Sequence, residues 1–304
     1  MLLIDAGPDI PVTRDREESW TSLEVQLSQV GIKTEDIRIV LITHAHLDHA
    51  GLAYRWASEG AAIVGGAADL GAIQRGQESR DIQRAHQITD LRRHGCPEKL
   101  MQQIQSHRSE IALKWKPCPS SAIGPAAKNY QLTKGRTLQI IDAPGHTPGN
   151  IVAYIPESGE LFSGDTILPT TIPTPGMHYP DATESNMEPQ RWPSLPPFIK
   201  SVNRIRELDI DLILPGHGDL VDDPARLFER FKKHHSRRSR RIREEINEEP
   251  LNAYTIARRM FPRLPSRRLV QAITEVLGHL DLLQALGEIE EFHGSNGELQ
   301  YRTY

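Results

Sequence analysis

Short apolar runs alternate with amphipathic stretches along most of the chain. Residues 37–43 (IRIVLIT) form an apolar run rich in β-branched side chains, which is typical of a strand inside a sheet. Apolar residues at Leu23, Leu27 and Val30 recur at helical spacing and predict a helix over 22–30. The two kinds of segment, interleaved, predict a layered α/β fold.

Further apolar runs predict the remaining strands of this fold: 2–4, 61–64, 138–141, 151–155, 161–162 and 210–214. The residues 156–159 (PESG) predict a hairpin turn between two of these runs. Apolar positions at helical spacing over 198–208 predict an amphipathic helix. The strands and helices continue in alternation up to about residue 222.

Two stretches interrupt the alternation of strands and helices. Residues 69–115 are polar, rich in Gln and Arg, and broken at 95–97 (GCP), which predicts an insert of two helices. The segment 169–197 contains eight prolines and predicts a long ordered loop. A loop of that length in a compact domain usually has a functional reason, so both stretches are candidates to form a pocket.

The composition changes after residue 224. A long basic helix is predicted first, then two helices over 253–260 and 266–286, and then a hairpin over 288–302. Two helices followed by a two-stranded hairpin look like a winged-helix module. The expected organisation is a layered domain, a connecting helix and a small C-terminal module, over 1–224, 225–249 and 250–304.

Composition places the chain among globular proteins. Its 304 residues are 38% hydrophobic and 25% charged, which argues against a disordered chain. No apolar run approaches the roughly 18 residues of a membrane-spanning helix, and the first residues lack the features of a signal peptide. We therefore expect a cytoplasmic protein without membrane contact. The two cysteines, Cys96 and Cys118, form no CxxC motif and predict neither a disulfide framework nor a thiolate metal site.

The charge is unevenly distributed. The net charge is −4, yet residues 226–268 contain fourteen Lys and Arg against five Glu. Such a segment is either a solvated helix face or a surface for a polyanion. The alternation of Arg and Glu favours the solvated face.

Ligand-type side chains are concentrated directly after the strand at 37–43, in the sequence THAHLDHAG. His44 and His46 lie two residues apart, so in extended backbone they point the same way and can share one cation. Asp48 and His49 follow where the chain turns, and can face a second cation. Nitrogen and oxygen ligands of this kind suit zinc.

Three later turns repeat the pattern of a strand, a glycine and one ligand. They present His146 in GHTPG, Asp165 in SGDT and His217 in PGHG. Each turn alone is a weak signal, because a structural histidine or a turn aspartate explains it equally well. Together with the THAHLDH segment they indicate one metal centre.

Through these four motifs the sequence resembles the metallo-β-lactamase superfamily over most of residues 1–222. The resemblance implies a four-layer αβ/βα sandwich, and the C-terminal module is similar to the winged-helix-like domain of lactamase-β-like and glyoxalase II-like hydrolases. It further implies a ligand set for two zinc ions: His44, His46 and His146 on the first, Asp48, His49 and His217 on the second, and Asp165 bridging both. Iron and manganese stay open as the native metal.

The resemblance implies hydrolysis by a hydroxide that bridges the two metals. Asp48 would also act catalytically, by orienting the hydroxide and returning a proton to the leaving group. Asp5, on the first strand, would support the ligands from behind. Family members usually start with two further strands before this one, so we expect either a longer natural N-terminus or a marginally stable protein.

Two functions are compatible with this chemistry. The leading hypothesis is a dinuclear zinc hydrolase of a small-molecule carboxylic thioester, ester or lactone, with Met177, His178 and Tyr179 in the substrate pocket. The alternative is a metal-dependent endoribonuclease or phosphodiesterase that grips single-stranded RNA with the basic segment. Acidic residues in the C-terminal hairpin argue against a nucleic-acid partner. A homodimer stays open.

Overall fold

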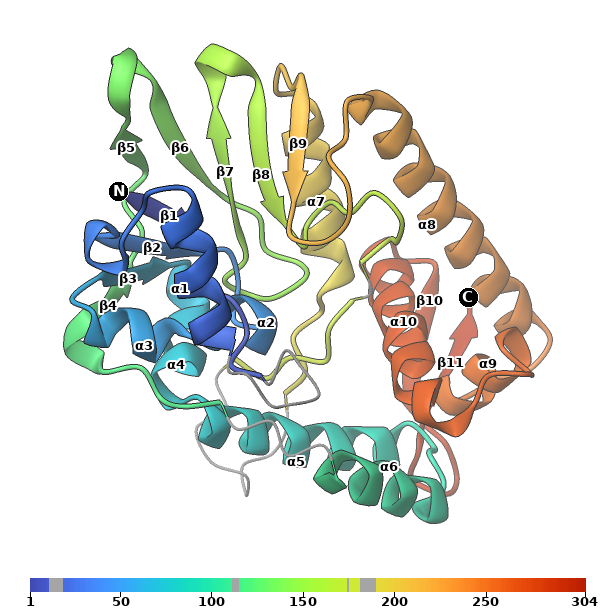
Figure 1. Ribbon diagram of the computed structural model, residues 1–304. Helices are drawn as coiled ribbons and strands as arrows, with labels where there is room; N and C mark the ends of the chain where they lie inside the picture. Colours follow the sequence, from blue (N-terminus) through green and yellow to red (C-terminus); the bar gives the residue numbers. More distant parts are fainter. Residues whose placement is uncertain (11–18, 111–114, 174, 181–189) are drawn as a thin grey trace.

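The computed structural model describes residues 1–10, 19–110, 115–173, 175–180 and 190–304 (Figure 1). Two β-sheets face each other, and helices cover the outer side of each sheet. This is the predicted four-layer αβ/βα sandwich, so the expected fold class is confirmed.

The two sheets differ in strand direction. The first is parallel, in the order β1 (Leu2–Ile4), β2 (Ile39–Ile42), β3 (Ala62–Gly65) and β4 (Ile123–Pro125). The second contains an antiparallel run of β5 (Asn129–Gln131), β6 (Thr137–Asp142), β7 (Ile151–Ile155) and β8 (Glu160–Gly164), with β9 (Leu212–Pro215) parallel to β8. Strands β4 and β5 were not predicted, because their sequences, IGP and NYQ, contain no apolar run.

An apolar layer joins the sheets. Leu41 of β2 is fully buried and packs in one cluster with Leu138 of β6 and Ile151 of β7. The sheets are thereby fixed face to face, with the ends of β2, β6, β8 and β9 close together. The loops that follow these strands carry the predicted metal ligands.

Aromatic side chains attach the outer helices. On the first sheet, Trp20 of α1 (Ser19–Gln29) meets Trp56 of α3 (Ala53–Ser58) edge to face, with ring centroids 4.9 Å apart. On the second sheet, Phe198 of α7 (Leu195–Arg206) stacks with Phe231 of α8 (Pro224–Asn247). The remaining short elements are α2 (Leu47–Ala50) and the 3₁₀ turns Thr34–Asp36, Ser120–Ala122, Thr133–Gly135 and Pro156–Ser158. The helices expected near 22–30 and 198–208 and the long basic helix are confirmed.

The polar insert contains three helices, so the prediction of two helices was wrong. They are α4 (Ala67–Arg75), α5 (Gln77–Arg93) and α6 (Glu98–Glu110). The extra break falls at Gly76, whose φ is +56° and where a Cβ would lie 2.6 Å from the carbonyl oxygen of Trp115. Only glycine fits there without strain. The predicted break at 95–97 is confirmed.

The C-terminal elements follow the predicted order: α9 (Ala253–Met260), α10 (Ser266–Ala285), and the antiparallel strands β10 (Ile289–His293) and β11 (Leu299–Thr303). They share an apolar core with the insert, in which Leu91 of α5 and Met101 of α6 pack with Ile256 and Leu280. Figure 1 shows α5 and α6 running towards these C-terminal helices. The division at residues 224 and 250 and the winged-helix assignment stay predictions. Among the described residues, no helix is both long and apolar enough to cross a membrane.

Candidate metal centre

The structure brings all seven predicted ligands to one place between the two sheets. They come from the end of β2 and helix α2, and from the loops after β6, β8 and β9: His44, His46, Asp48, His49, His146, Asp165 and His217. Residues 173 positions apart in sequence therefore surround one site. The convergence follows from the face-to-face sheets, whose loops open on the same side.

Three histidines form the first group. Nε2 of His44 lies 2.9 Å from Nδ1 of His46, and Nε2 of His146 lies 3.1 Å from the same atom. Burial lowers the pKa of His46 to about 4 and holds the pKa values of His44 and His146 well below the usual range. Neutral rings present lone pairs at their unprotonated nitrogens, and three such nitrogens at one point fit a cation.

Asp48, His49 and His217 form the second group. Nε2 of His217 lies 3.3 Å from Nε2 of His49 and 3.1 Å from Oδ2 of Asp48. Asp165 lies between the two groups, with Oδ1 3.4 Å from Nε2 of His49 and Oδ2 3.6 Å from Nε2 of His146. One carboxylate thus faces both groups, as a bridging ligand would.

The donors fit a pair of divalent cations. Oδ1 of Asp165 is buried and has no hydrogen-bond partner among the residues that the structure describes. A buried anionic oxygen without a partner is costly unless a cation neutralises it. Imidazole and carboxylate ligands suit zinc, and also iron or manganese.

Asp5 supports this centre from behind. Its carboxylate accepts hydrogen bonds from the backbone N–H of Thr43, from the Thr43 hydroxyl and from Nδ1 of His49 at 2.8, 3.0 and 2.7 Å. Burial lowers the pKa of His49, but the nearby carboxylates of Asp165 and Asp5 outweigh burial and raise it to about 10. Asp5 thus fixes the His49 ring so that Nε2 faces the cation site.

Asp69 is a supporting residue that the sequence interpretation missed. This buried carboxylate accepts hydrogen bonds from the backbone N–H groups of Ala45 and Gly149 and from the Thr147 hydroxyl, at 2.8, 2.7 and 2.6 Å. It therefore ties the loop of His44 and His46 to the loop of His146. The available signal was an acidic residue in the first turn of a helix, which is common for dipole reasons and identifies no partner.

A glycine permits the close approach of the last ligand loop. A Cβ at Gly216 would lie 2.6 Å from Oδ1 of Asp165 and 2.8 Å from Cε1 of His49. Any larger residue would displace a ligand, which explains the glycine before His217.

The three predicted pocket residues lie beside the centre in different ways. His178 donates from Nε2 to the backbone oxygen of His146 at 2.8 Å, and its ring stacks on His46. The side chains of Met177 and Tyr179 are buried, and the Tyr179 hydroxyl donates to Asp90 of α5. His178 thus contacts two of the predicted metal-binding histidines, whereas the Tyr179 hydroxyl is bonded to Asp90. A role of all three in substrate binding stays a prediction.

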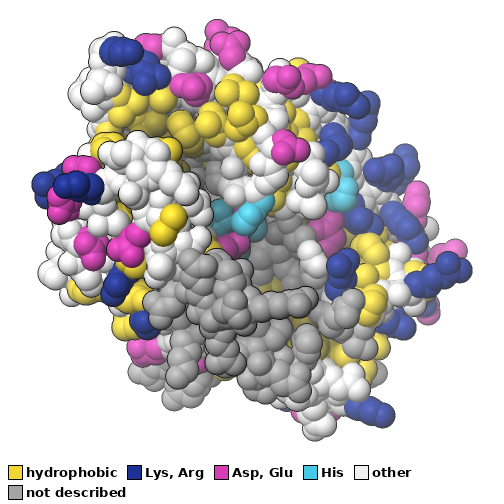
Figure 2. Space-filling model, in the orientation of Figure 1, with side chains coloured by type: hydrophobic (Ala, Val, Ile, Leu, Met, Phe, Trp, Pro, Cys, Tyr) yellow, Lys and Arg dark blue, Asp and Glu magenta, His cyan; other side chains and the backbone are white. Residues whose placement is uncertain are grey.

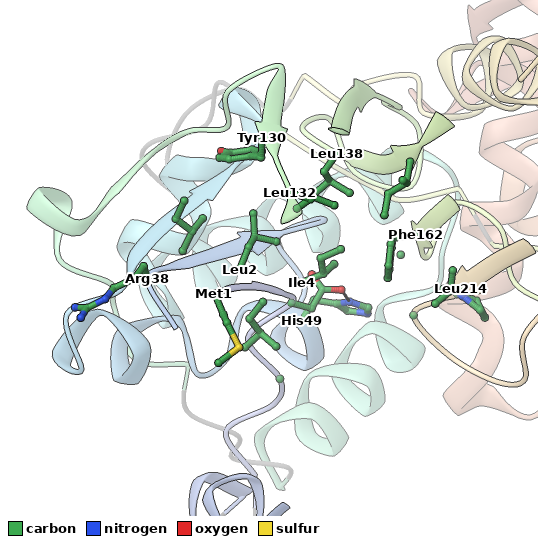
Figure 3. Close-up of a pocket in the computed structure, with 18 of the residues that line it drawn as sticks. Met1, Leu2, Ile4, Arg38, His49, Tyr130, Leu132, Leu138, Phe162 and Leu214 are labelled. Atoms are coloured by element: carbon green, nitrogen blue, oxygen red, sulfur yellow. Dashed lines mark hydrogen bonds and ion pairs between the residues drawn. The ribbon is translucent and has the colours of Figure 1, made fainter. Parts of the chain in front are cut away.

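Two hollows open at the metal centre. One of about 930 Å³ is lined by His46, Asp48 and His146 and by residues of α4, α5 and α10. The other, of about 1030 Å³, is an apolar groove between β1 and the second sheet, and it reaches His49 and His217. Figure 3 shows Leu2, Ile4, Leu138 and Phe162 lining this groove beside His49. In Figure 2, histidine side chains lie in a hollow below a large apolar patch.

The fold and the two ligand groups define a metal-dependent hydrolase. The chain belongs to the Metallo-beta-lactamase superfamily, whose family model matches residues 2–217. It is 28% identical to "Probable metallo-hydrolase YqjP" of Bacillus subtilis, over 97% of this chain and 88% of that protein. A beta-lactamase domain protein from Burkholderia ambifaria has the same fold, with a TM-score of 0.76 and 22% identity over all of this chain and 83% of that one. This chain is also 52% identical to "Hydroxyacylglutathione hydrolase" of a Synechococcus strain, but only over 34 residues, which are 11% of this chain and 14% of that protein.

Proposed function

We propose that the protein is a dinuclear zinc-dependent hydrolase of a carboxylic thioester, ester or lactone. The observation that carries this proposal is the position of Asp165, whose two oxygens face the two ligand groups at 3.4 and 3.6 Å. A shared ligand of this kind suits a pair of metals that act on one substrate. Both hollows reach this point, so a substrate can approach it.

Zinc bound here would lower the pKa of water and polarise the substrate carbonyl. The side chains of the protein supply proton transfer and the positioning of the ligands. The half-exposed carboxylate of Asp48 lies at the edge of both hollows and can hold a proton and return it to the leaving group. Asp5 and Asp69 keep the ligand loops in place. Met177 and Tyr179, on either side of His178, pack into the apolar core that the insert shares with the C-terminal helices.

An acyl substrate is favoured over a phosphodiester by two observations. The short similarity to a hydroxyacylglutathione hydrolase concerns an enzyme named for an acylglutathione. The basic face of α8, which the nucleic-acid alternative requires, is partly engaged in ion pairs within the chain. Arg238 contacts Glu275 at 3.4 Å and Arg243 contacts Glu288 at 2.9 Å.

The hollow beside α5 favours a substrate that carries an anionic group. Arg75 of α4 and Arg80 and Arg84 of α5 line it, and Nε of Arg75 is buried with no hydrogen-bond partner among the described residues. The lining carboxylates Asp48 and Asp69 are engaged at the metal centre. The positive charge on this wall suits the carboxylate or phosphate of an acyl carrier.

The proposal is tested by turnover of zinc-loaded protein on acyl-glutathione, acyl-CoA, simple ester and lactone substrates. We expect hydrolysis of at least one class, and a loss of about 10²–10⁴-fold in kcat for Asp48→Ala, as for removal of a proton-transfer group. Glu244→Ala is the control, because this exposed carboxylate on α8 pairs with Arg240 and lines neither hollow. If protein that holds two metal ions hydrolyses none of these substrates, the acyl proposal is overturned. Cleavage of single-stranded RNA by the same protein would favour the nuclease alternative.

A further inference from the structure

A second group of histidines lies far from the metal centre, between α8 and α10. His234 and His235 are on α8 and His279 is on α10, and one ring nitrogen from each lies within 4.8 Å of the others. Oε1 of Glu275, one turn before His279, lies 3.2 Å from Nε2 of His234 and 3.5 Å from Nε2 of His279. The same oxygen lies 3.4 Å from Nε of Arg238, whose place a zinc ion would take as the charge partner of this carboxylate. Three imidazoles and a carboxylate thus converge on one point.

Two of these histidines are buried and incompletely bonded. His235 is 7% exposed and His279 is fully buried. Neither ring nitrogen of His235 has a hydrogen-bond partner among the described residues, and Nε2 of His279 has none either. A buried polar group without a partner is costly, and such groups usually point to an unseen ligand, water or ion.

We propose that His234, His235, His279 and Glu275 form a second, separate zinc site that joins α8 to α10. Three imidazoles and one carboxylate make a familiar tetrahedral set for zinc. Zinc–nitrogen bonds are about 2.0–2.1 Å long, so binding requires the rings to move closer together by side-chain rotation.

One imidazole of the cluster is already held in the orientation that a metal ligand needs. The Ser239 hydroxyl lies 2.8 Å from Nδ1 of His279 and fixes that ring with Nε2 towards Glu275. Bonding of the second ring nitrogen is typical of histidine ligands of metals.

An ion can reach this site, and its binding would affect the active site. A cavity of about 580 Å³ between α7, α8 and α10 is lined by His235 and Ser239. Further along α10, Gln271 and Thr274 line the hollow beside the metal centre. A zinc ion that fixes Glu275 and His279 would therefore hold the helix that closes the substrate hollow.

The test is the zinc content of the full chain after saturation and removal of loose metal. We expect one equivalent more in the wild type than in His235→Leu, whose side chain fits the apolar surroundings of Phe198 and Phe231. His86→Leu is the matched control, because His86 is equally buried but lies in no three-residue ligand group of the described chain. We expect this control to keep the wild-type zinc content.

A second measurement separates this site from the catalytic one. A variant with His44 and His46 both replaced by Ala should still bind the extra zinc, and zinc should still raise its melting temperature. Equal zinc content in wild type and His235→Leu would overturn the proposal. If His235→Leu does not fold, Glu275→Gln takes its place, and a wild type that holds no more than two zinc ions overturns the proposal without any variant.

Discussion

The carboxylate of Asp5 lies 2.7 Å from Nδ1 of His49 and directs the opposite nitrogen of that ring towards His217. The same carboxylate holds Thr43, the residue before the first histidine ligand. Asp5 adopts a φ of +62°, which is uncommon outside glycine and asparagine. Backbone conformation and hydrogen bonds together place this side chain behind the second ligand group.

Asp5→Asn should weaken binding of the second metal by about 10–100-fold, as is typical for loss of a carboxylate behind a histidine ligand. Asparagine accepts the same φ, so the fold should persist. We expect activity to fall at limiting zinc and to recover at high zinc, as measured by metal titration. Asp9→Asn is the control, because Asp9 contacts Lys116 instead of a ligand. Unchanged zinc affinity in Asp5→Asn would contradict this role.

Replacement of Asp69 should destabilise the loops that carry the first ligand group. Asp69→Ala leaves two backbone N–H groups and the Thr147 hydroxyl without their acceptor in a buried place. We expect a loss of about 3–5 kcal/mol in the free energy of unfolding, measured by urea denaturation. Asp142→Ala, an exposed residue at the end of β6, should change stability by less than about 0.5 kcal/mol. Equal stabilities of the two variants would show that the Asp69 contacts are dispensable.

The outcome for the ligands shows what the sequence alone could predict. His44, His46, Asp48 and His49 are close in sequence, and each later ligand follows a strand and a glycine, so local patterns were sufficient to find them. Asp69 was missed because its partners, Ala45 and Thr147, are distant in sequence and mostly backbone groups. The strands β4 and β5 were missed because a Gly-Pro pair and polar residues leave them without an apolar run.

The second histidine group shows the same limit. His234 and His235 looked like part of a basic, solvated helix, because neither their spacing nor their neighbours indicate a metal site. Only the packing of α8 against α10 brings His279 and Glu275 to them. Local motifs therefore predicted a centre whose ligands each follow a strand, while a site between two helices required the packed structure.

The arginine wall of the hollow should select anionic substrates. If Arg84 contacts an anionic group, Arg84→Gln should raise KM for an anionic thioester by about 5–10-fold, which corresponds to about 1–1.4 kcal/mol for a partly exposed charge pair. KM for a neutral ester should stay within twofold, and kcat should change little for either substrate. Arg92→Gln is the control, because Arg92 pairs with Glu98 outside the hollow. An equal rise in KM for charged and neutral substrates would argue against charge recognition.

His94 should make the fold sensitive to acid. Burial, with a smaller contribution from Arg191 and Arg93, lowers its pKa to about 3, and its ring lies near Asp90 and Tyr301. In the unfolded chain the pKa of histidine is about 6.5. Between these two values the unfolded state binds a proton that the folded state does not, so stability falls as the pH falls, by up to about 1.4 kcal/mol per pH unit.

His94→Gln should therefore flatten the dependence of the free energy of unfolding on pH between about 6.5 and 4. The quantity to measure is the difference between variant and wild type by urea denaturation at several pH values, because the other titrating groups then cancel. His293→Gln, which replaces an exposed histidine of β10, should leave the slope unchanged. A His94→Gln slope equal to that of the wild type would mean that His94 gains its proton in the folded protein at little cost.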